Sequence, residues 1–264
     1  MTFQESSLLF QNPDLTGLAM DETRAGSLPT RSPQFGFPLW GGEKTWIAPD
    51  SSWANGAPSA VLDSGAYEVT SKGSNHLKMV SPVCPNSQLS ITRLVTINSG
   101  NEWTIDHSVT SYGSSSRWTG IWSVMMLDTP AKIAVEMDEP VMQPVFGDVD
   151  GMVAKGDGCV VADCKRQQQF KIGLSNPTGR TVIRCCKDTL WLECLVAKPQ
   201  PSDRFAHQYP FEIFNSGDYD YCEAEWHSPA RSLSPNETLQ FRQVFRLSAD
   251  KDATRSLRNE KEMI

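Results

Sequence analysis

The sequence lacks the features that mark secreted, membrane and nucleic-acid-binding proteins. Its first ten residues have neither the basic start nor the apolar stretch of a secretory signal, and no apolar run reaches the roughly 18 residues of a membrane span. Basic residues are outnumbered, giving a formal net charge of -7. Without a secretory signal or a membrane span, we expect a cytoplasmic protein. The negative charge repels polyanions, so we expect it to bind neither nucleic acid nor membranes.

Motifs for metals, phosphates and serine nucleophiles are also missing. There is no H-E-x-x-H, no phosphate-binding glycine loop and no G-x-S-x-G elbow. The seven cysteines are an odd number, which fits reduced, buried thiols better than a disulfide framework. We therefore expect no metal and no cofactor.

Helical periodicity is scarce, whereas short β-branched and aromatic segments separated by turn residues are frequent. This pattern predicts an all-β protein of two packed antiparallel sheets, with an arm at 1–34, one β-sandwich domain at 35–249 and a charged tail at 250–264. The expected strands are 60–70, 88–97, 103–110, 117–127, 132–137, 159–163, 169–174, 181–186, 190–197, 211–214, 219–226 and 238–247.

The most informative segment for function is 219–229. As a strand, it would place Tyr221, Glu223, Glu225 and His227 on one face and Trp226 with other core residues on the opposite face. Two carboxylates beside an imidazole suit general acid and base catalysis. The alternative is a solvated outer face, but such a face more often mixes charges of both signs.

A second segment, 35–49, combines glycines with aromatic residues, and Trp53 extends it. Aromatic faces stack on sugar rings, and paired glycines let the backbone approach a ligand. The segment predicts sugar contacts, although it could equally plug the end of the sandwich with its indole rings. The candidates for sugar binding in and near it are Trp40, Glu43, Lys44, Trp46 and Trp53.

Three further residues are weaker candidates. His107 shares a strand face with Trp103 and Ile105, so it is either a core histidine or part of a cleft. His207 precedes an aromatic segment and could reach the same cleft. Arg117 could bind a phosphate, although a lone strand arginine is more often solvated or paired.

The order of three segments resembles the galactose mutarotase-like proteins. These are Gly41-Gly42-Glu43-Lys44-Thr45-Trp46-Ile47-Ala48-Pro49, then His107-Ser108-Val109-Thr110, then Glu223-Ala224-Glu225-Trp226-His227-Ser228-Pro229. An uncharacterised bacterial branch with a GGxxxWxAP loop is the most similar. The resemblance implies a large twisted antiparallel β-sandwich whose concave sheet binds a monosaccharide or glycan.

The resemblance also implies a reaction. In mutarotases of this fold a Glu takes the proton of the anomeric hydroxyl and a His protonates the ring oxygen; here the base would be Glu225 or Glu223, and the acid His107 or His227. The first hypothesis is thus an isomerase similar to aldose 1-epimerases, a monomer or homodimer acting on a small sugar. The alternatives are a non-catalytic carbohydrate-binding or sensing domain, or a glycan hydrolase or lyase on the same scaffold.

Overall fold

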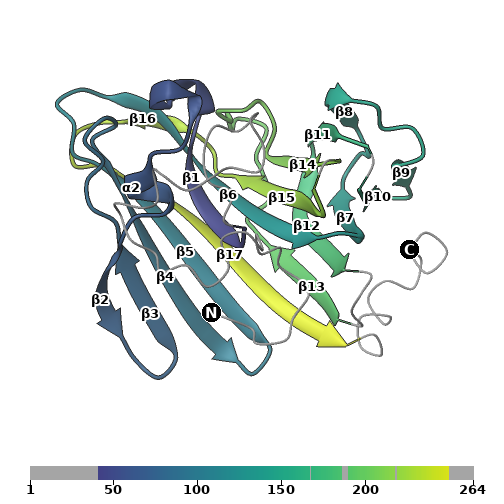
Figure 1. Cartoon of the computed structure of the whole chain (residues 1–264), viewed down its shortest axis with the longest axis horizontal. Coiled ribbons are helices and arrows are strands. Elements are labelled where there is room, and N and C mark those ends of the chain that lie inside the picture. The colour runs from purple at the N-terminus through teal and green to yellow at the C-terminus, as the bar shows by residue number, and fades with distance from the viewer. Residues whose placement is uncertain (1–40, 167, 186–189, 218, 250–264) are drawn as a thin grey trace.

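The computed structural model describes residues 41–166, 168–185, 190–217 and 219–249 (Figure 1). Within these ranges the strands form two large antiparallel sheets, so the prediction of an all-β sandwich is confirmed. The expected arm at 1–34, the tail at 250–264 and Trp40 lie outside the described residues.

The smaller sheet has seven strands in the described residues. Along its main path the order is β1-β6-β15-β14-β11-β8, and β16 pairs with the other end of β6. Their bounds are β1 Glu43–Ala48, β6 Arg117–Asp128, β15 Tyr221–His227, β14 Phe211–Asn215, β11 Phe170–Leu174, β8 Met142–Gly147 and β16 Arg231–Leu233.

The larger sheet has ten strands in the same part of the chain. Its order is β2-β3-β4-β5-β17-β13-β12-β7-β10-β9. The bounds are β2 Glu68–Lys72, β3 His76–Val80, β4 Leu89–Ser99, β5 Glu102–Ser111, β17 Thr238–Ala249, β13 Leu190–Leu195, β12 Pro177–Cys185, β7 Ala131–Met137, β10 Cys159–Cys164 and β9 Val153–Gly156.

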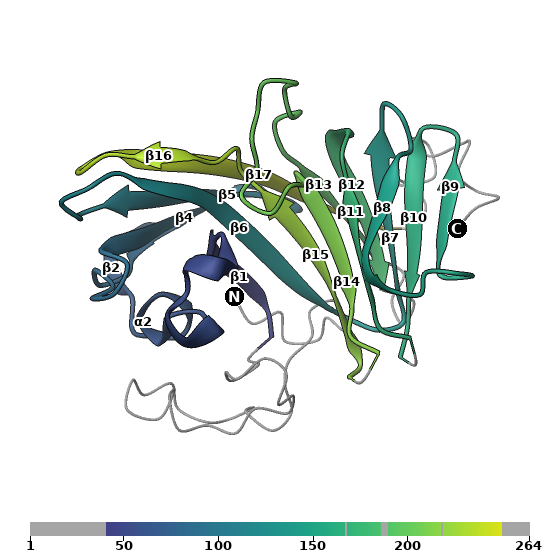
Figure 2. The same cartoon turned by 90° about the horizontal axis from the view of Figure 1, so that it is seen from above.

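The two sheets lie against each other, as the view from above shows (Figure 2). Their facing sides form one apolar core, to which Leu127 and Trp226 contribute from the smaller sheet and Leu192 and Phe245 from the larger. Trp226 and Phe245 are in edge-to-face contact, with ring centroids 6.3 Å apart. Burial of such large apolar side chains is the main force that holds the layers together.

Strand β15 shows the predicted alternation. Cys222, Ala224 and Trp226 belong to the core between the sheets. Because successive side chains of a strand point to opposite faces, Tyr221, Glu223, Glu225 and His227 lie on the face turned away from the larger sheet. We call this side of the smaller sheet the outer face.

The expected strand at 60–70 is wrong in its first part. Ala60–Asp63 form one helical turn, α2, and the strand β2 begins only at Glu68. The turn is closed by hydrogen bonds from Ser64 and Gly65 to the carbonyl of Ala60, and it buries Leu62. Short 3₁₀ turns, η1 at Asp50–Ser52 and η2 at Ala54–Gly56, precede it. The apolar run Ala60-Val61-Leu62 therefore belongs to a helical turn. From sequence alone, such a short apolar run is compatible with either a helical turn or a strand.

Two other expectations concern cysteines and membrane helices. Among the described cysteines, Cys84, Cys159, Cys164, Cys194 and Cys222 are buried thiols outside any disulfide, as predicted. No helix within the described residues has the length and apolarity needed to cross a bilayer.

A buried polar bridge connects the two sheets at His107 on β5. The His107 Nε2–H donates to Oε1 of Gln243 at 2.8 Å, and the hydroxyl of Thr45 on β1 donates to Nδ1 at 2.8 Å. Ser123 on β6 also donates to Gln243 Oε1 at 2.8 Å. Burial, assisted by the charge of Arg93, lowers the pKa of His107 to about 3, so the ring is neutral. His107 is thus a hydrogen-bonded core histidine between the layers.

Replacing His107 by leucine is expected to destabilise the fold by roughly 2–4 kcal/mol, because Thr45 and Gln243 would lose their partner inside the core. Urea unfolding followed by tryptophan fluorescence measures this loss. Ser108→Ala, on the other face of β5, is the matched control and should change stability by less than about 0.5 kcal/mol.

Candidate functional site

Three carboxyl groups lie side by side on the outer face. Glu223 and Glu225 come from β15, and Glu212 on β14 stands directly opposite Glu225 in the strand register. All three are buried: Glu225 is 0% exposed, Glu212 3% and Glu223 7%. Like charges directly opposite each other destabilise a sheet, so this arrangement requires compensation.

Lys171 on β11 supplies much of that compensation. Its Nζ lies 2.9 Å from Glu225 Oε2 and 3.1 Å from Glu212 Oε2, and 5.2 Å from the ring centroid of Trp122. Burial alone would lower the pKa of Lys171, but the charges of Glu225 and Glu212 outweigh burial and raise it. The side chain is therefore an ammonium ion shared by two carboxylates.

Two histidines approach the same oxygen of Glu212 that pairs with Lys171. Glu212 Oε2 lies 3.2 Å from His227 Nε2 and 3.5 Å from His207 Nδ1. The second nitrogen of His207, Nε2, lies 3.5 Å from a carboxylate oxygen of Asp50, at the start of η1. Burial opposes ionisation of Glu212, but the hydrogen bonds from both histidines hold its pKa well below the usual range.

The two histidines differ in protonation. For His207, burial favours the neutral ring, but the hydrogen bonds and charges of Asp50 and Glu212 prevail and raise its pKa to about 9. For His227 burial prevails, and its pKa falls to about 4 in spite of Glu212. At neutral pH these pKa values favour an imidazolium at His207 and a neutral imidazole at His227. The protonated Nε2 of His207 then donates to the Asp50 carboxylate in place of accepting from the Asp50 backbone N–H at 3.3 Å.

The loop before β14 holds His207 over the sheet. Tyr209 of the same loop packs on Gly173 of β11. A Cβ added to Gly173 would lie 2.2 Å from a carbon of the Tyr209 ring. Gly173 stands opposite Glu212 in the register, so the missing side chain lets the loop approach the carboxylate. The ring of His207 also contacts Trp122, with centroids 4.4 Å apart.

Glu225 is held by two donors on one oxygen. Trp122 Nε1–H donates to Glu225 Oε2 at 2.8 Å, beside the Lys171 ammonium. The other oxygen, Oε1, is buried and has no hydrogen-bond partner among the residues that the structure describes. Burial raises the pKa of Glu225, while the charge of Lys171 opposes this. A carboxylate with one unsatisfied oxygen and a raised pKa is suited to accept a proton.

Tryptophan rings cover the β1 and β6 side of the outer face. The Trp53 ring stacks on Trp122 at 5.7 Å, and Trp46 meets Trp122 edge-on at 4.9 Å. Trp46 Nε1–H and Lys44 Nζ both donate to Asp63 of α2, at 2.7 and 2.9 Å. The carboxylates and the indole rings therefore form one continuous surface.

A cavity of about 580 Å³ opens beside these rings. Trp46, Trp53, Asp63 and Arg117 are among the residues that line it. Its volume and its mixture of aromatic and polar groups are typical of a site for a small organic ligand.

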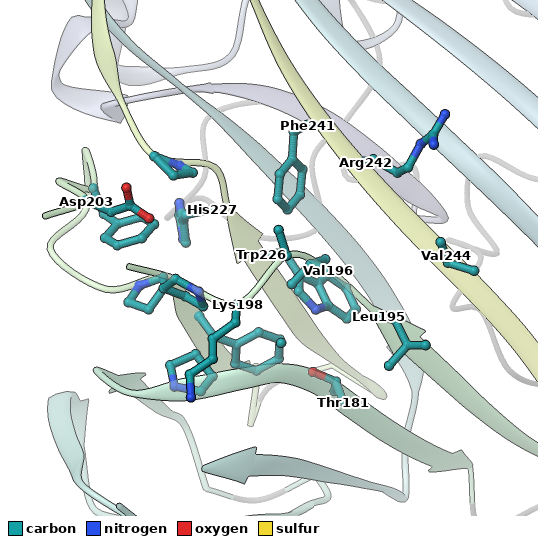
Figure 3. Close-up of a pocket in the computed structure, with 18 of the residues that line it drawn as sticks. Thr181, Leu195, Val196, Lys198, Asp203, Trp226, His227, Phe241, Arg242 and Val244 are labelled. Carbon is teal, nitrogen blue, oxygen red and sulfur yellow. The ribbon is translucent and has the colours of Figure 1, made fainter. Parts of the chain in front are cut away.

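A second cavity, of about 420 Å³, lies at the end of β15 and is lined by residues of both sheets and the adjoining loops (Figure 3). Trp226 and His227 line it together with Thr181, Val196 and Phe241 (Figure 3). Most of its walls are apolar, and neither this cavity nor the one beside Trp46 has Glu212, Glu223 or Glu225 among its lining residues. We place the chemistry on the outer face because the ionisable groups gather there.

The composition of one cluster is that of a metal site. His207, Glu212 and His227 present ligand atoms that all lie within 4.8 Å of one another. However, the ammonium of Lys171 lies 3.1 Å from the same Glu212 oxygen that the histidines face. A metal ion there would meet a fixed positive charge, so these residues fit an ion-paired hydrogen-bond network better than a metal centre.

The structure brings most of the sequence-predicted site residues together. Grouped on the outer face or its adjoining loops are Glu223, Glu225, His227, Tyr221, His207, Lys44, Trp46 and Trp53. Arg117 lies at the edge, where it lines the aromatic cavity and donates to the carbonyl of Ser52 at 3.3 Å.

Two predicted residues lie elsewhere. His107 belongs to the bridge between the sheets, on the opposite side of the smaller sheet from Glu225. Glu43 also lies on that inner side, where it accepts a hydrogen bond from Ser123 and pairs with Arg93. The alternation along β1 separates Glu43 from Lys44, because neighbouring residues of a strand point to opposite faces.

Sequence reasoning missed four participants: Lys171, Glu212, Trp122 and Asp50. The first three lie in segments that were predicted to be strands. Their signal would have been a polar or aromatic side chain on an otherwise apolar strand. Only the strand order shows that β6 and β14 flank β15 and that β11 lies next to β14.

Comparison with known proteins supports the fold. No protein-family model and no curated protein sequence matches this chain. A crystal structure of a candidate aldose 1-epimerase from Escherichia coli K12 matches with a TM-score of 0.52 and 13% identity, over 70% of this chain and 69% of that one. The chain therefore has the galactose mutarotase-like β-sandwich fold.

Two longer matches agree with this assignment. The Slr1438 protein from Synechocystis sp. PCC 6803 matches with a TM-score of 0.55 and 11% identity, over 92% of this chain and 84% of that one. The candidate mutarotase YeaD from Salmonella typhimurium has the same TM-score of 0.55 and 11% identity, over 92% and 80% of the two chains. At these identities the likeness concerns the fold.

Proposed function

We propose that this protein of galactose mutarotase-like fold binds an aldose on the outer face of the smaller sheet and interconverts its anomers. Glu225 acts as the general base and His207 as the general acid. The observation that carries the proposal is the meeting of a protonated imidazole and a buried carboxylate at the ring of Trp122.

The chemistry requires two proton transfers. The Glu225 carboxylate takes the proton of the anomeric hydroxyl, and that oxygen forms a carbonyl bond to the anomeric carbon as the bond to the ring oxygen breaks. The ring oxygen takes a proton from His207. Rotation about the bond next to the carbonyl carbon and ring closure then return both protons and give the other anomer. No net oxidation occurs, and no cofactor is consumed.

His207 fits the acid role better than the other histidines. It is protonated at neutral pH, because Asp50 and Glu212 stabilise its charge, whereas His227 is neutral. His107 lies between the sheets. His207 and Glu225 both contact Trp122 and are linked through Glu212 and Lys171, which fixes their relative position.

A second function, binding without catalysis, is favoured by one observation. The Glu225 side chain is fully buried, so a ligand reaches it only after a local movement. A sugar in the cavity beside Trp46 and Trp53 needs no such movement. The deciding experiment is polarimetry of freshly dissolved aldoses: anomerisation faster than in buffer supports the enzyme, and binding without acceleration supports the binding protein.

The rate of anomerisation is expected to fall by about tenfold per pH unit above pH 9, because His207 loses the proton it must donate. The measurement is the pH dependence of kcat from pH 6 to 10.5. A rate that stays level to the end of this range would exclude His207 as the acid.

His207 should also make stability pH-dependent. Its pKa is about 9 in the folded chain against 6.5 in the unfolded chain, so its stabilising effect is complete below pH 6.5 and is lost as the pH rises through 9. Relative to His207→Gln, the free energy of unfolding should decline by up to about 1.4 kcal/mol per pH unit in this window. The charged groups that interact with His207 are Asp50, Glu212 and Glu225, with His227 beside it.

A further inference from the structure

One carboxyl group of the outer face has no cation bound to it in the described part of the chain. Asp63 holds Lys44, Glu212 and Glu225 share Lys171, and Asp50 faces His207. Glu223 makes no such pair and no hydrogen bond there, although it is only 7% exposed. Burying a carboxyl group without a partner is costly, so a positively charged group supplied by the ligand would stabilise it.

The neighbours of Glu223 explain why it stays unpaired. In the strand register it stands between Met126 on β6 and Phe214 on β14, and both are apolar. Tyr221 and Glu225 are its neighbours along β15. Burial raises the pKa of Glu223 well above the usual value, and the charge of Glu225 acts in the same direction. The Lys171 and Lys44 charges oppose this shift from a distance without bonding to the group.

We propose that the substrate is an amino sugar, a 2-amino-2-deoxy aldose whose ammonium group binds Glu223 while its anomeric hydroxyl faces Glu225. This inference rests on the proposed function. Glu223 and Glu225 are alternate residues on one face of a strand, about 6.6 Å apart along it. The amino group and the anomeric hydroxyl are on adjacent carbons, so each reaches one carboxylate through one hydrogen bond.

Charge also argues against the other sugar classes. A phosphorylated sugar would bring negative charge beside Glu223 and Glu225. A neutral sugar would offer only hydroxyl groups to Glu223, and hydrogen bonds that involve a charge on both partners are stronger than those to hydroxyls. An ammonium ion supplies the positive charge that stabilises the ionised form of Glu223, which burial disfavours in the free protein.

The test compares wild-type kcat/KM for anomerisation of glucosamine, glucose and N-acetylglucosamine. Glucosamine should be favoured by about 10- to 100-fold over the two neutral sugars, as expected for one charged hydrogen bond. In Glu223→Gln this preference should fall towards one. Glu68→Gln, an exposed glutamate on β2, is the matched control and should keep the full preference.

The outcomes separate the two proposals. If the wild-type protein accelerates the anomerisation of glucose and shows no preference for glucosamine, the amino-sugar inference is overturned, whereas the proposed anomerase function is supported. If anomerisation of no sugar is accelerated, the proposed anomerase function is wrong. Calorimetric titration with glucosamine then tests the amino-sugar inference by itself. Binding of glucosamine that Glu223→Gln abolishes supports this inference, and absence of binding overturns it.

Discussion

Glu225→Gln is expected to reduce kcat for anomerisation by about 10²- to 10⁴-fold, the usual contribution of a positioned general base. Glutamine keeps the shape of the side chain and the hydrogen bond from Trp122, but it has no lone pair basic enough to take the hydroxyl proton. The measurement is the rate of optical rotation change of a fresh aldose solution, corrected for the spontaneous rate in the same buffer.

Folding must be controlled in that experiment, because Glu225 also pairs with Lys171. Circular dichroism and the urea midpoint of the variant show whether the sheet is intact. An intact variant that retains more than a third of the wild-type rate contradicts the assignment of Glu225 as base. Applying the same assay to Glu223→Gln tells which of the two glutamates takes the proton.

Lys171→Met is expected to destabilise the protein by about 3–5 kcal/mol, because it leaves Glu212 and Glu225 buried without their shared cation. Methionine retains most of the apolar stem of lysine, so the loss reports mainly on charge. Urea unfolding at neutral pH gives the free energy of unfolding. Lys155→Met, on the exposed part of β9, is the matched control.

A double variant separates charge from packing. Lys171→Met combined with Glu225→Gln removes the uncompensated charge on β15 and should recover at least 1 kcal/mol of the loss, by a double-mutant cycle. If the Lys171→Met variant is as stable as the wild type, Lys171 does not compensate the charges of Glu212 and Glu225 as we infer. If the double variant recovers nothing, the loss is one of packing.

Much of the fold was predictable because alternation is a local signal. The sequence of β15 predicts which residues share a face, and the structure places Trp226 in the core and Glu225 on the outer face accordingly. The segment beginning at Ala60 shows the limit of that signal: a short apolar run is compatible with a strand or a helical turn, and α2 was therefore missed.

The site was predictable only in part, since strand neighbours are set by pairing between distant segments. Glu212 meets Glu225 because β14 pairs with β15, and Lys171 joins them because β11 follows β14. His107 illustrates the opposite error. Its strand face was identified correctly as apolar, but the sequence does not reveal that β5 belongs to the other sheet.

The two sheets differ in which of them carries the ionisable groups of the site, and this difference has an evolutionary consequence. Among the described residues, every ionisable group assigned a chemical role belongs to a strand of the smaller sheet or to a loop that adjoins it, whereas the larger sheet meets it through the core and the His107 bridge. Substitutions on the solvent side of the larger sheet can therefore accumulate without altering ligand preference. New specificities would arise instead from a few exchanges along β14 and β15.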